Sequence, residues 1–311
     1  MDAAVQSAET MAFLRTLVAG EPNLAVKCDD DLAKIFLGQK HRLLAALSSQ
    51  AMIKRFMEIV APGGYGFTIA RTRYFDDVLL QETRAGIQQL VLLGAGYDSR
   101  PFRFRDSLHD VCIFEIDHPA TQARKQRMLM RAGKASPPNL RYLPVDFNKN
   151  SVRQALVEHG FAMYRRTLFL WEGVSYYLPQ QVVEDVLDFV AGCAPESSIV
   201  FDYATRRFIN GDTSTYGGKQ VARWLKRIGE PFLFGLDPGE AEAFLSRRML
   251  HLVSDLGPED LEALYLRTKD GRCLGKMLGH IRMAQSRAAG ASSPVWHVGQ
   301  DVSARANAVE V

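Results

Sequence analysis

The chain has 311 residues, of which 47% are hydrophobic and 23% are charged, and its formal net charge at pH 7 is +3. Such a composition is typical of a globular protein with a large core, in one elaborated domain or in two. The small net charge and the lack of a dense basic run give no support to nucleic-acid binding. No uninterrupted apolar run reaches the length of a transmembrane helix, so no membrane partner is expected.

The cysteines and the first residues bear on compartment and metal binding. The four cysteines form no CxxC or Cys/His spacing, so no metal site is expected; they are Cys28, Cys112, Cys193 and Cys273. The N-terminal sequence Met-Asp-Ala-Ala-Val-Gln has neither the basic nor the apolar region of a signal peptide. We therefore expect a reduced, cytoplasmic protein, and the sequence leaves its oligomeric state open.

The first part of the chain is predicted to be helical. Over residues 5–60 apolar side chains recur every three or four positions, and Pro62-Gly63-Gly64-Tyr65-Gly66 then breaks this pattern sharply. A further helix is expected to open at residues 70–77 and to run into Thr83. We interpret residues 1–85 as an N-terminal helical cap that precedes the first strand.

A glycine turn then follows the first predicted strand. Leu90–Leu93 is a short apolar run, typical of a buried parallel strand, and Gly94 and Gly96 come directly after it. Glycine lets the backbone turn tightly and approach a ligand closely. In open α/β sheets, ligands bind at the carboxyl ends of the strands, but the same pattern is equally typical of an ordinary turn.

A second apolar strand, Val111–Ile116, favours the ligand-binding interpretation. Glu115 and Asp117 stand at its end on one side of the strand, about 20 residues beyond the glycines, where an acid binds a ribose hydroxyl. The dinucleotide fingerprint requires a third glycine, and this chain has Ser99 there. This departure argues against NAD and FAD and favours a ligand with a ribose but no pyrophosphate, such as S-adenosylmethionine (SAM).

The remaining elements are predicted to alternate between helices and strands. Helices are expected at 121–131, with a solvated basic face, and at 151–159, 181–193, 219–228 and 238–247; strands are expected at 140–145, 167–171, 197–203, 249–254 and 278–285. The segment of about 204–248 is polar at its start and is interpreted as an insertion. Residues 286–311 are rich in Ala, Ser, Gly and Val without periodicity, so we expect a flexible tail.

Four motifs together resemble one family. They are Leu-Gly-Ala-Gly-Tyr-Asp-Ser-Arg, Phe-Glu-Ile-Asp-His-Pro, Val-Asp-Phe and Trp-Glu-Gly-Val-Ser-Tyr-Tyr-Leu, in this order. The chain resembles the leucine carboxyl methyltransferases, a branch of the class I SAM-dependent methyltransferases, from about Arg15 to Arg287. Within that family it is most similar to members that esterify small-molecule carboxylates of the polyketide type. The resemblance implies an α/β, Rossmann-like sheet at 86–285, mostly parallel with one antiparallel strand, and a lid insertion at about 204–248.

The resemblance also implies SAM as the cofactor and assigns residues to it. An arginine that holds the methionine carboxylate corresponds to Arg71, with Arg73 as the alternative, although either position is also typical of a surface arginine paired with a neighbouring aspartate. Asp117 corresponds to the ribose contact, and Asp146 and Phe147 correspond to the adenine contacts. Asp146 is equally placed to cap the helix that follows.

Two further acids are candidates for the methionine end of the cofactor. Glu172 matches a cofactor-contacting acid of the family and is placed to bind the methionine ammonium. Asp98 is placed either to meet this ammonium or to cap the segment after the glycine turn. With Gly94 and Gly96, Glu172 completes the expected cofactor site.

No catalytic nucleophile or base is evident, because the sequence lacks GxSxG, HExxH and P-loop patterns. A carboxylate acceptor is already ionised at neutral pH and needs no strong base. The candidates for positioning the acceptor are Tyr176, Tyr203, Arg206 and Arg207, and Tyr177 is a further candidate for shaping the acceptor pocket. Each is also typical of a core or surface residue. The scattered histidines His118, His251 and His280 are expected to be structural.

These observations predict a SAM-dependent O-methyltransferase that esterifies a carboxyl group of a small molecule, such as a polyketide or aromatic acid. One alternative is a SAM-binding partner or sensor protein without turnover. Another is a tRNA-modifying carboxyl methyltransferase, against which the low net charge counts. The sequence does not identify the acceptor, nor does it separate a small molecule from the C-terminus of a protein.

Overall fold

A computed structural model describes residues 3–25, 27–47, 49–147 and 151–289. Its centre is a seven-stranded sheet in the order β3-β2-β1-β4-β5-β7-β6. The strands are β1 (Gln89–Leu93), β2 (Cys112–Asp117), β3 (Leu140–Pro144), β4 (Thr167–Trp171), β5 (Ser198–Ala204), β6 (Leu250–Leu256) and β7 (Ile281–Ala288). Only β7 is antiparallel to its neighbours. The predicted fold class, a mostly parallel α/β sheet with one antiparallel strand, is confirmed.

The central strands are buried on both faces, which explains their continuous apolar sequences. Every residue of β1, β4 and β5 is buried, as expected for parallel strands covered by helices on both sides. Successive side chains alternate between two cores. Leu90 and Leu92 belong to one core, and Val91 and Leu93 belong to the other.

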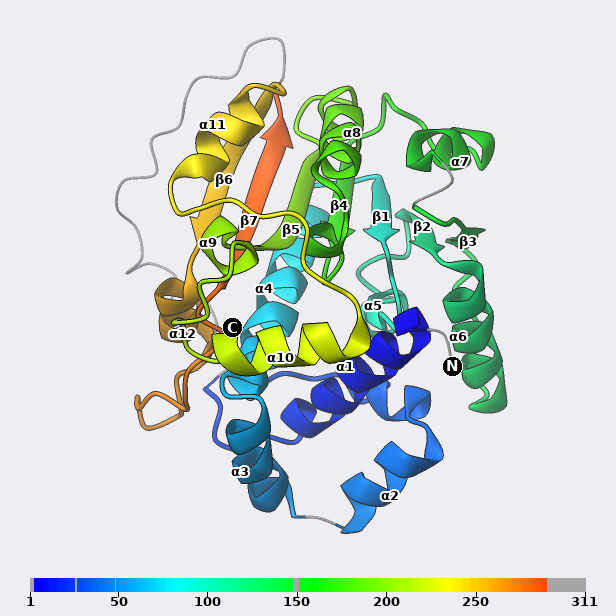
Figure 1. Ribbon diagram of the computed structural model, residues 1–311. Coiled ribbons are helices and arrows are strands. Elements are labelled where there is room, and N and C mark those ends of the chain that lie inside the picture. The colour runs from blue at the N-terminus through cyan, green and yellow to red at the C-terminus, as the bar shows by residue number, and fades with distance from the viewer. Residues whose placement is uncertain (1–2, 26, 48, 148–150, 290–311) are drawn as a thin grey trace.

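Helices cover each face of the sheet (Figure 1). The first core includes residues of α4 (Gly64–Arg84), α6 (Pro119–Arg131) and α12 (Pro258–Tyr265). The second includes residues of α7 (Val152–Glu158), α8 (Gln180–Ala191) and α11 (Glu240–Ser246). The short α5 (Arg100–Arg103) follows the glycine turn. Because β1 to β5 are parallel, the loops that follow them lie at the same edge of the sheet.

The N-terminal segment forms α1 (Ala3–Ala19), the short helix η1 (Ala33–Phe36), α2 (Gln39–Leu47) and α3 (Gln50–Val60), as predicted. The next helix begins earlier than expected, because α4 starts at Gly64 rather than near residue 70. Gly63, with φ of +80°, makes the break. Gly66 is helical, and a Cβ there would lie 2.4 Å from the carbonyl oxygen of Lys276. Its glycine therefore permits close packing of helix and loop rather than a turn.

Three helices lie between β5 and β6: α9 (Arg206–Ile209), α10 (Gly218–Ile228) and α11. α11 packs on the sheet, whereas α10 lies outside it, on the same side of the molecule as α1 (Figure 1). β7 ends at Ala288, so it includes the first residues of the predicted tail, and residues 290–311 lie outside the described residues. No described helix is both long and apolar enough to cross a membrane.

His280 joins α9 to the beginning of β7. Its side chain is fully buried, and its ring stacks on Phe208 with a centroid separation of 3.9 Å and an interplanar angle of 14°. Burial lowers the pKa of His280 to about 4, because the charged ring would lose its hydration. This placement agrees with a structural role.

The lowered pKa of His280 predicts a specific pH dependence of stability. The unfolded chain takes up this proton below about pH 6.5, whereas the folded protein resists it down to about pH 4. Stability should therefore fall as the pH falls through this window, by up to roughly 1.4 kcal/mol per pH unit. His280→Phe keeps the stacked ring and should flatten the curve of unfolding free energy against pH. The exposed His251, changed to Phe, is the control, and identical slopes for both variants would contradict this account.

Candidate active site

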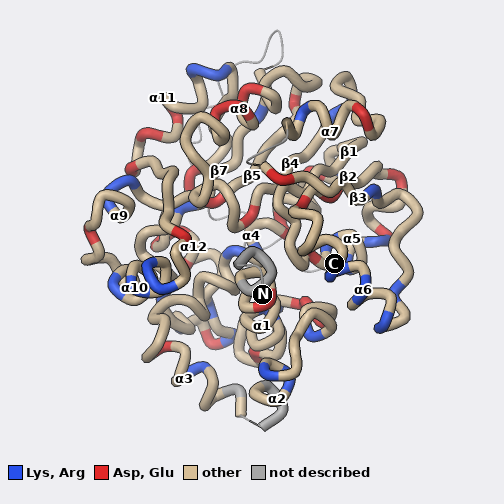
Figure 2. The backbone as a smooth tube through the Cα atoms, turned by 45° about the vertical axis from the view of Figure 1, so that its right-hand side comes forward, with Lys and Arg blue, Asp and Glu red and all other residues tan. Residues whose placement is uncertain are grey.

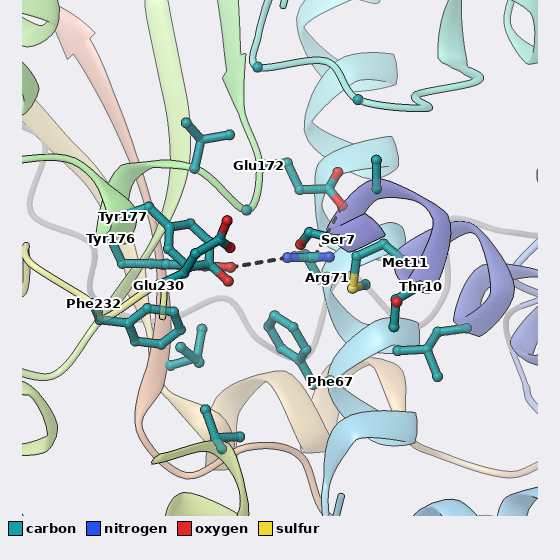
Figure 3. Close-up of a pocket in the computed structure, with 18 of the residues that line it drawn as sticks. Ser7, Thr10, Met11, Phe67, Arg71, Glu172, Tyr176, Tyr177, Glu230 and Phe232 are labelled. Carbon is teal, nitrogen blue, oxygen red and sulfur yellow. Dashed lines mark hydrogen bonds and ion pairs between the residues drawn. The ribbon is translucent and has the colours of Figure 1, made fainter. Parts of the chain in front are cut away.

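A cavity of about 1010 Å³ opens at the carboxyl ends of β1, β2, β3 and β4. Ligand sites typically measure roughly 300–1,000 Å³, so this cavity lies at the upper end of that range. α1, α3, α4 and α10 complete its walls, and Figure 3 shows side chains that line it. All seven residues predicted to bind the cofactor line this one cavity: Arg71, Gly94, Gly96, Asp117, Asp146, Phe147 and Glu172.

The glycine turn is built as its sequence predicts. Gly94 and Gly96 have φ values of +66° and +52°, in the left-handed region that side chains with a Cβ rarely adopt. A Cβ on Gly94 would lie 2.5 Å from Cγ2 of Val174, in the loop after β4. The turn therefore packs against the neighbouring loop only because residue 94 has no side chain.

This contact makes Gly94→Ala a direct test of the turn. We expect the variant to lose about 1–3 kcal/mol of stability through overpacking and to bind SAM about tenfold more weakly. Gly133→Ala is the matched control, because Gly133 has the same φ of +66° but open space around it. Adding Val174→Ala should restore SAM affinity, because it removes the Cγ2 methyl group with which the new Cβ clashes. Equal effects of Gly94→Ala and Gly133→Ala would show that only backbone strain matters.

Asp117 ties the turn to the end of β2. Its carboxylate accepts hydrogen bonds from the backbone N–H groups of Gly96 and His118, the latter at 2.6 Å. Burial raises the pKa of Asp117, while these backbone donors favour its charged form. The acid predicted from its spacing to the glycines is thus in direct contact with the turn.

Glu115 does not join Asp117 at the cavity. Both side chains leave β2 on the same side, but α6 covers Glu115, whose Oε2 pairs with Nζ of Lys125 at 2.7 Å. Neither side chain is accessible to solvent, and burial raises the pKa of Glu115 to about 7 against the opposing charge of Lys125. The prediction of a wholly solvated basic face on this helix is wrong, since Lys125 is an internal counter-ion and Arg124 pairs with Glu9 at 2.7 Å.

Arg71, rather than Arg73, reaches the cavity. Its Nε lies 3.1 Å from Glu172 Oε1 and its Nη1 lies 3.2 Å from Asp202 Oδ2. Nη1 also donates to the hydroxyl of Tyr176 at 3.4 Å, so Arg71 stands between Glu172 and Tyr176 (Figure 3). Arg73 pairs with Asp77 four residues later at 2.8 Å and does not line the cavity.

Arg100 is a buried member of the site that the sequence analysis missed. Its Nη2 lies 2.8 Å from Glu172 Oε2, and its Nη1 lies 2.6 Å from Asp98 Oδ2. Asp98 lines the cavity and also accepts from the Arg100 backbone N–H at 2.7 Å, as a local turn cap does. Burial opposes the charge on Asp98, but Arg100 outweighs it and lowers the Asp98 pKa to about 2.

Asp146 and Phe147 lie just after β3, half-buried on the cavity wall. Asp146 does not cap the following helix, because Ser151 does so by accepting from the Gln154 backbone N–H at 3.3 Å. The alternative prediction that Asp146 caps this helix is therefore wrong, and Asp146 lines the cavity.

An aromatic wall faces α1 across the cavity (Figure 3). Tyr176 and Tyr177 lie in the short helix η2 (Ser175–Tyr177), and both line the cavity. The ring of Phe232 lies 4.3 Å from that of Tyr176 and 5.1 Å from that of Tyr177, measured between centroids. Phe67 of α4 packs under the Arg71 guanidinium at 4.5 Å.

The structure does not bring Tyr203 and Arg206 to the cavity. Side chains alternate along β5, so Asp202 points toward Arg71 while Tyr203 points to the other face, where its hydroxyl donates to Asp255 at 2.7 Å. Arg206 is exposed and pairs with Glu240 at 2.9 Å, and Arg207 is also exposed and does not line the cavity. The arginines of the insertion that do line the cavity are Arg223 and Arg227 of α10.

The model of the family described as leucine carboxyl methyltransferase matches residues 8–191, which is more than half of the chain. The chain belongs to the leucine carboxyl methyltransferase family. This finding confirms the resemblance carried by the four motifs. All seven predicted cofactor residues lie within the matched part, whereas α10, with Arg223 and Arg227, lies beyond it.

A curated relative and two solved structures are also similar to this chain. The "Putative S-adenosyl-L-methionine-dependent methyltransferase YktD" of Bacillus subtilis is 32% identical over 198 residues, 63% of this chain. That match spans 65% of YktD, which is less than two thirds of its length. A DUF574 family protein from Streptomyces avermitilis is similar in structure, with a TM-score of 0.56, 15% identity, and coverage of 92% of this chain and 100% of that one.

A second crystal structure, of "a putative methyltransferase" from Thermobifida fusca, has a TM-score of 0.55 and 19% identity. The similarity covers 90% of this chain and 94% of that one. At these identities both structures support the fold of this leucine carboxyl methyltransferase family member.

Proposed function

We propose that this protein is a SAM-dependent O-methyltransferase that esterifies a carboxyl group of a small molecule, such as a polyketide or aromatic acid. One observation carries the proposal. A single cavity is lined both by the glycine turn, Asp117 and Asp146 and by a set of apolar and aromatic side chains. It is large enough for a cofactor and an acceptor together.

The residues at the turn fit SAM. Gly94 and Gly96 leave the turn without side chains, Asp117 offers carboxylate oxygens for a ribose, and Phe147 offers an apolar ring beside Asp146 for adenine. Arg71 retains donor capacity, because its Nη2 donates no hydrogen bond to any described residue. That N–H₂ group is suited to a carboxylate such as the one of the methionine part.

When bound, SAM supplies a methyl group on a positively charged sulfonium sulfur. A carboxylate acceptor is already ionised at neutral pH, so no side chain has to remove a proton from it. His118 is the only histidine among the described residues that line the cavity, and its Nδ1 accepts from the backbone N–H of Ala120 at the start of α6. The chain's task is to align two bound molecules and to exclude water, for which a deep, apolar cavity is suited.

The proposal is tested by turnover. Purified protein is incubated with SAM and a set of aromatic and polyketide-like acids, and the products are analysed by mass spectrometry. The primary amide of each acid serves as the matched control. Methyl esters from acids and no product from amides are expected. SAM binding without a methyl ester from any acid would contradict the proposal and favour a SAM-binding partner protein without turnover.

A further inference from the structure

α10 is a strongly basic helix. It carries Lys219, Arg223, Lys226 and Arg227 and no acidic residue, and Figure 2 shows its blue segments. Arg223 and Arg227 are four residues apart, on one face of the helix, and both line the cavity. Neither forms an ion pair or side-chain hydrogen bond with a described residue, whereas Arg15 and Arg71, which also line the cavity, are each paired with an acid. Two guanidinium groups on one helix face repel each other when no counter-ion is present. Their arrangement is therefore suited to binding an anionic ligand.

These two arginines stand at the mouth of the cavity. Their side chains are exposed, whereas Arg71 is buried, so the interior and the mouth each have their own guanidinium groups. Trp224, between them in the sequence, also lines the cavity and is 38% exposed. An anion held by Arg223 and Arg227 therefore lies at the entrance, next to an indole ring.

Apolar residues line the rest of the mouth. Ile59 and Val60 of α3 line the cavity, yet they are 70% and 52% exposed. Further inside, Phe67 and Phe232 continue the apolar lining toward Arg71 (Figure 3). Large apolar side chains left exposed around a cavity indicate an apolar ligand that covers them when it is bound.

We propose that the acceptor is an elongated dianion, with an apolar body between a reacting carboxylate inside the cavity and a second anionic group on Arg223 and Arg227. The inference rests on the proposed function in that it places the reacting carboxylate at the interior end. It adds a specificity site formed by α10, outside the part of the chain that matches the family model. The expected product is a half-ester that keeps its second anionic group.

The test compares α,ω-dicarboxylic acids of increasing chain length with monocarboxylic acids of equal length. Affinity is measured by calorimetry with and without S-adenosylhomocysteine, and methyl transfer is measured by mass spectrometry with SAM. At the best length, the diacid should bind about tenfold more tightly than its monoacid. Arg223→Gln and Arg227→Gln should remove this advantage, because they should weaken binding of the diacid about tenfold more than binding of the monoacid.

Lys226→Gln is the matched control, because Lys226 lies on the same helix and is exposed but does not line the cavity. Equal weakening of both acids by the arginine variants would overturn the inference, since the arginines would then hold the reacting carboxylate itself. Absence of any diacid preference would overturn it as well. Preferential diacid binding without ester formation would contradict the proposed function only, and ester formation without preference would contradict this inference only.

Discussion

Lys125→Met is expected to lower the free energy of unfolding by about 3–5 kcal/mol, because it leaves a buried carboxylate without its counter-ion. Lys125 and Glu115 are 2.7 Å apart, and neither side chain reaches solvent. The loss should be smaller below about pH 7, the raised pKa of Glu115, where this carboxyl can take up a proton. Denaturant titrations at several pH values measure both effects.

The double variant Glu115→Leu, Lys125→Met separates the ion pair from general damage to the core. It should recover most of the lost stability, because apolar replacement of both partners removes the buried charge altogether. Lys134→Met makes the same substitution at an exposed lysine just after α6, so it should have little effect on the free energy of unfolding. A double variant no more stable than Lys125→Met would contradict the account.

Asp117→Ala is expected to weaken SAM binding roughly 10- to 100-fold, since hydrogen bonds to a charged group contribute about 1.5–3 kcal/mol. The variant removes the carboxylate that is proposed to accept hydrogen bonds from the ribose hydroxyls. The same carboxylate accepts from the Gly96 backbone N–H, so this hydrogen bond is lost as well. Calorimetric titration measures the affinity, and circular dichroism verifies that the variant is folded. Asp185→Ala, on the exposed side of α8, is the control. Unchanged affinity in a folded Asp117→Ala protein would remove Asp117 from the site.

The parts of the site that could be predicted from the sequence are those set by short-range rules. Gly94, Gly96, Asp117 and Glu172 each lie at or just beyond the carboxyl end of a parallel strand, so the topology of the sheet brings them to one edge. The order of the parallel strands is therefore enough to predict that these residues share one cavity.

Other parts depend on how distant elements pack. Lys125 is internal because α6 rests on the side of β2 that carries Glu115, which helical periodicity alone does not show. Tyr203 was expected at the acceptor, but strand alternation assigns the inward side to Asp202. Arg223 lines the cavity and Arg206 does not, because α10 is the part of the insertion that folds back across the cavity. Arg100 belongs to the site through its buried ion pair with Glu172, which the sequence does not show.

The most direct test of the central claim is a calorimetric titration of the purified protein with SAM and S-adenosylhomocysteine, with NAD as the control. We predict saturable binding of both SAM and S-adenosylhomocysteine and no binding of NAD. This expectation follows from the cavity, its glycine turn and Asp117, which has the spacing from the turn that is typical of a ribose-binding acid. A folded protein that binds neither would contradict the account, because the turn and its acids would then only support the fold.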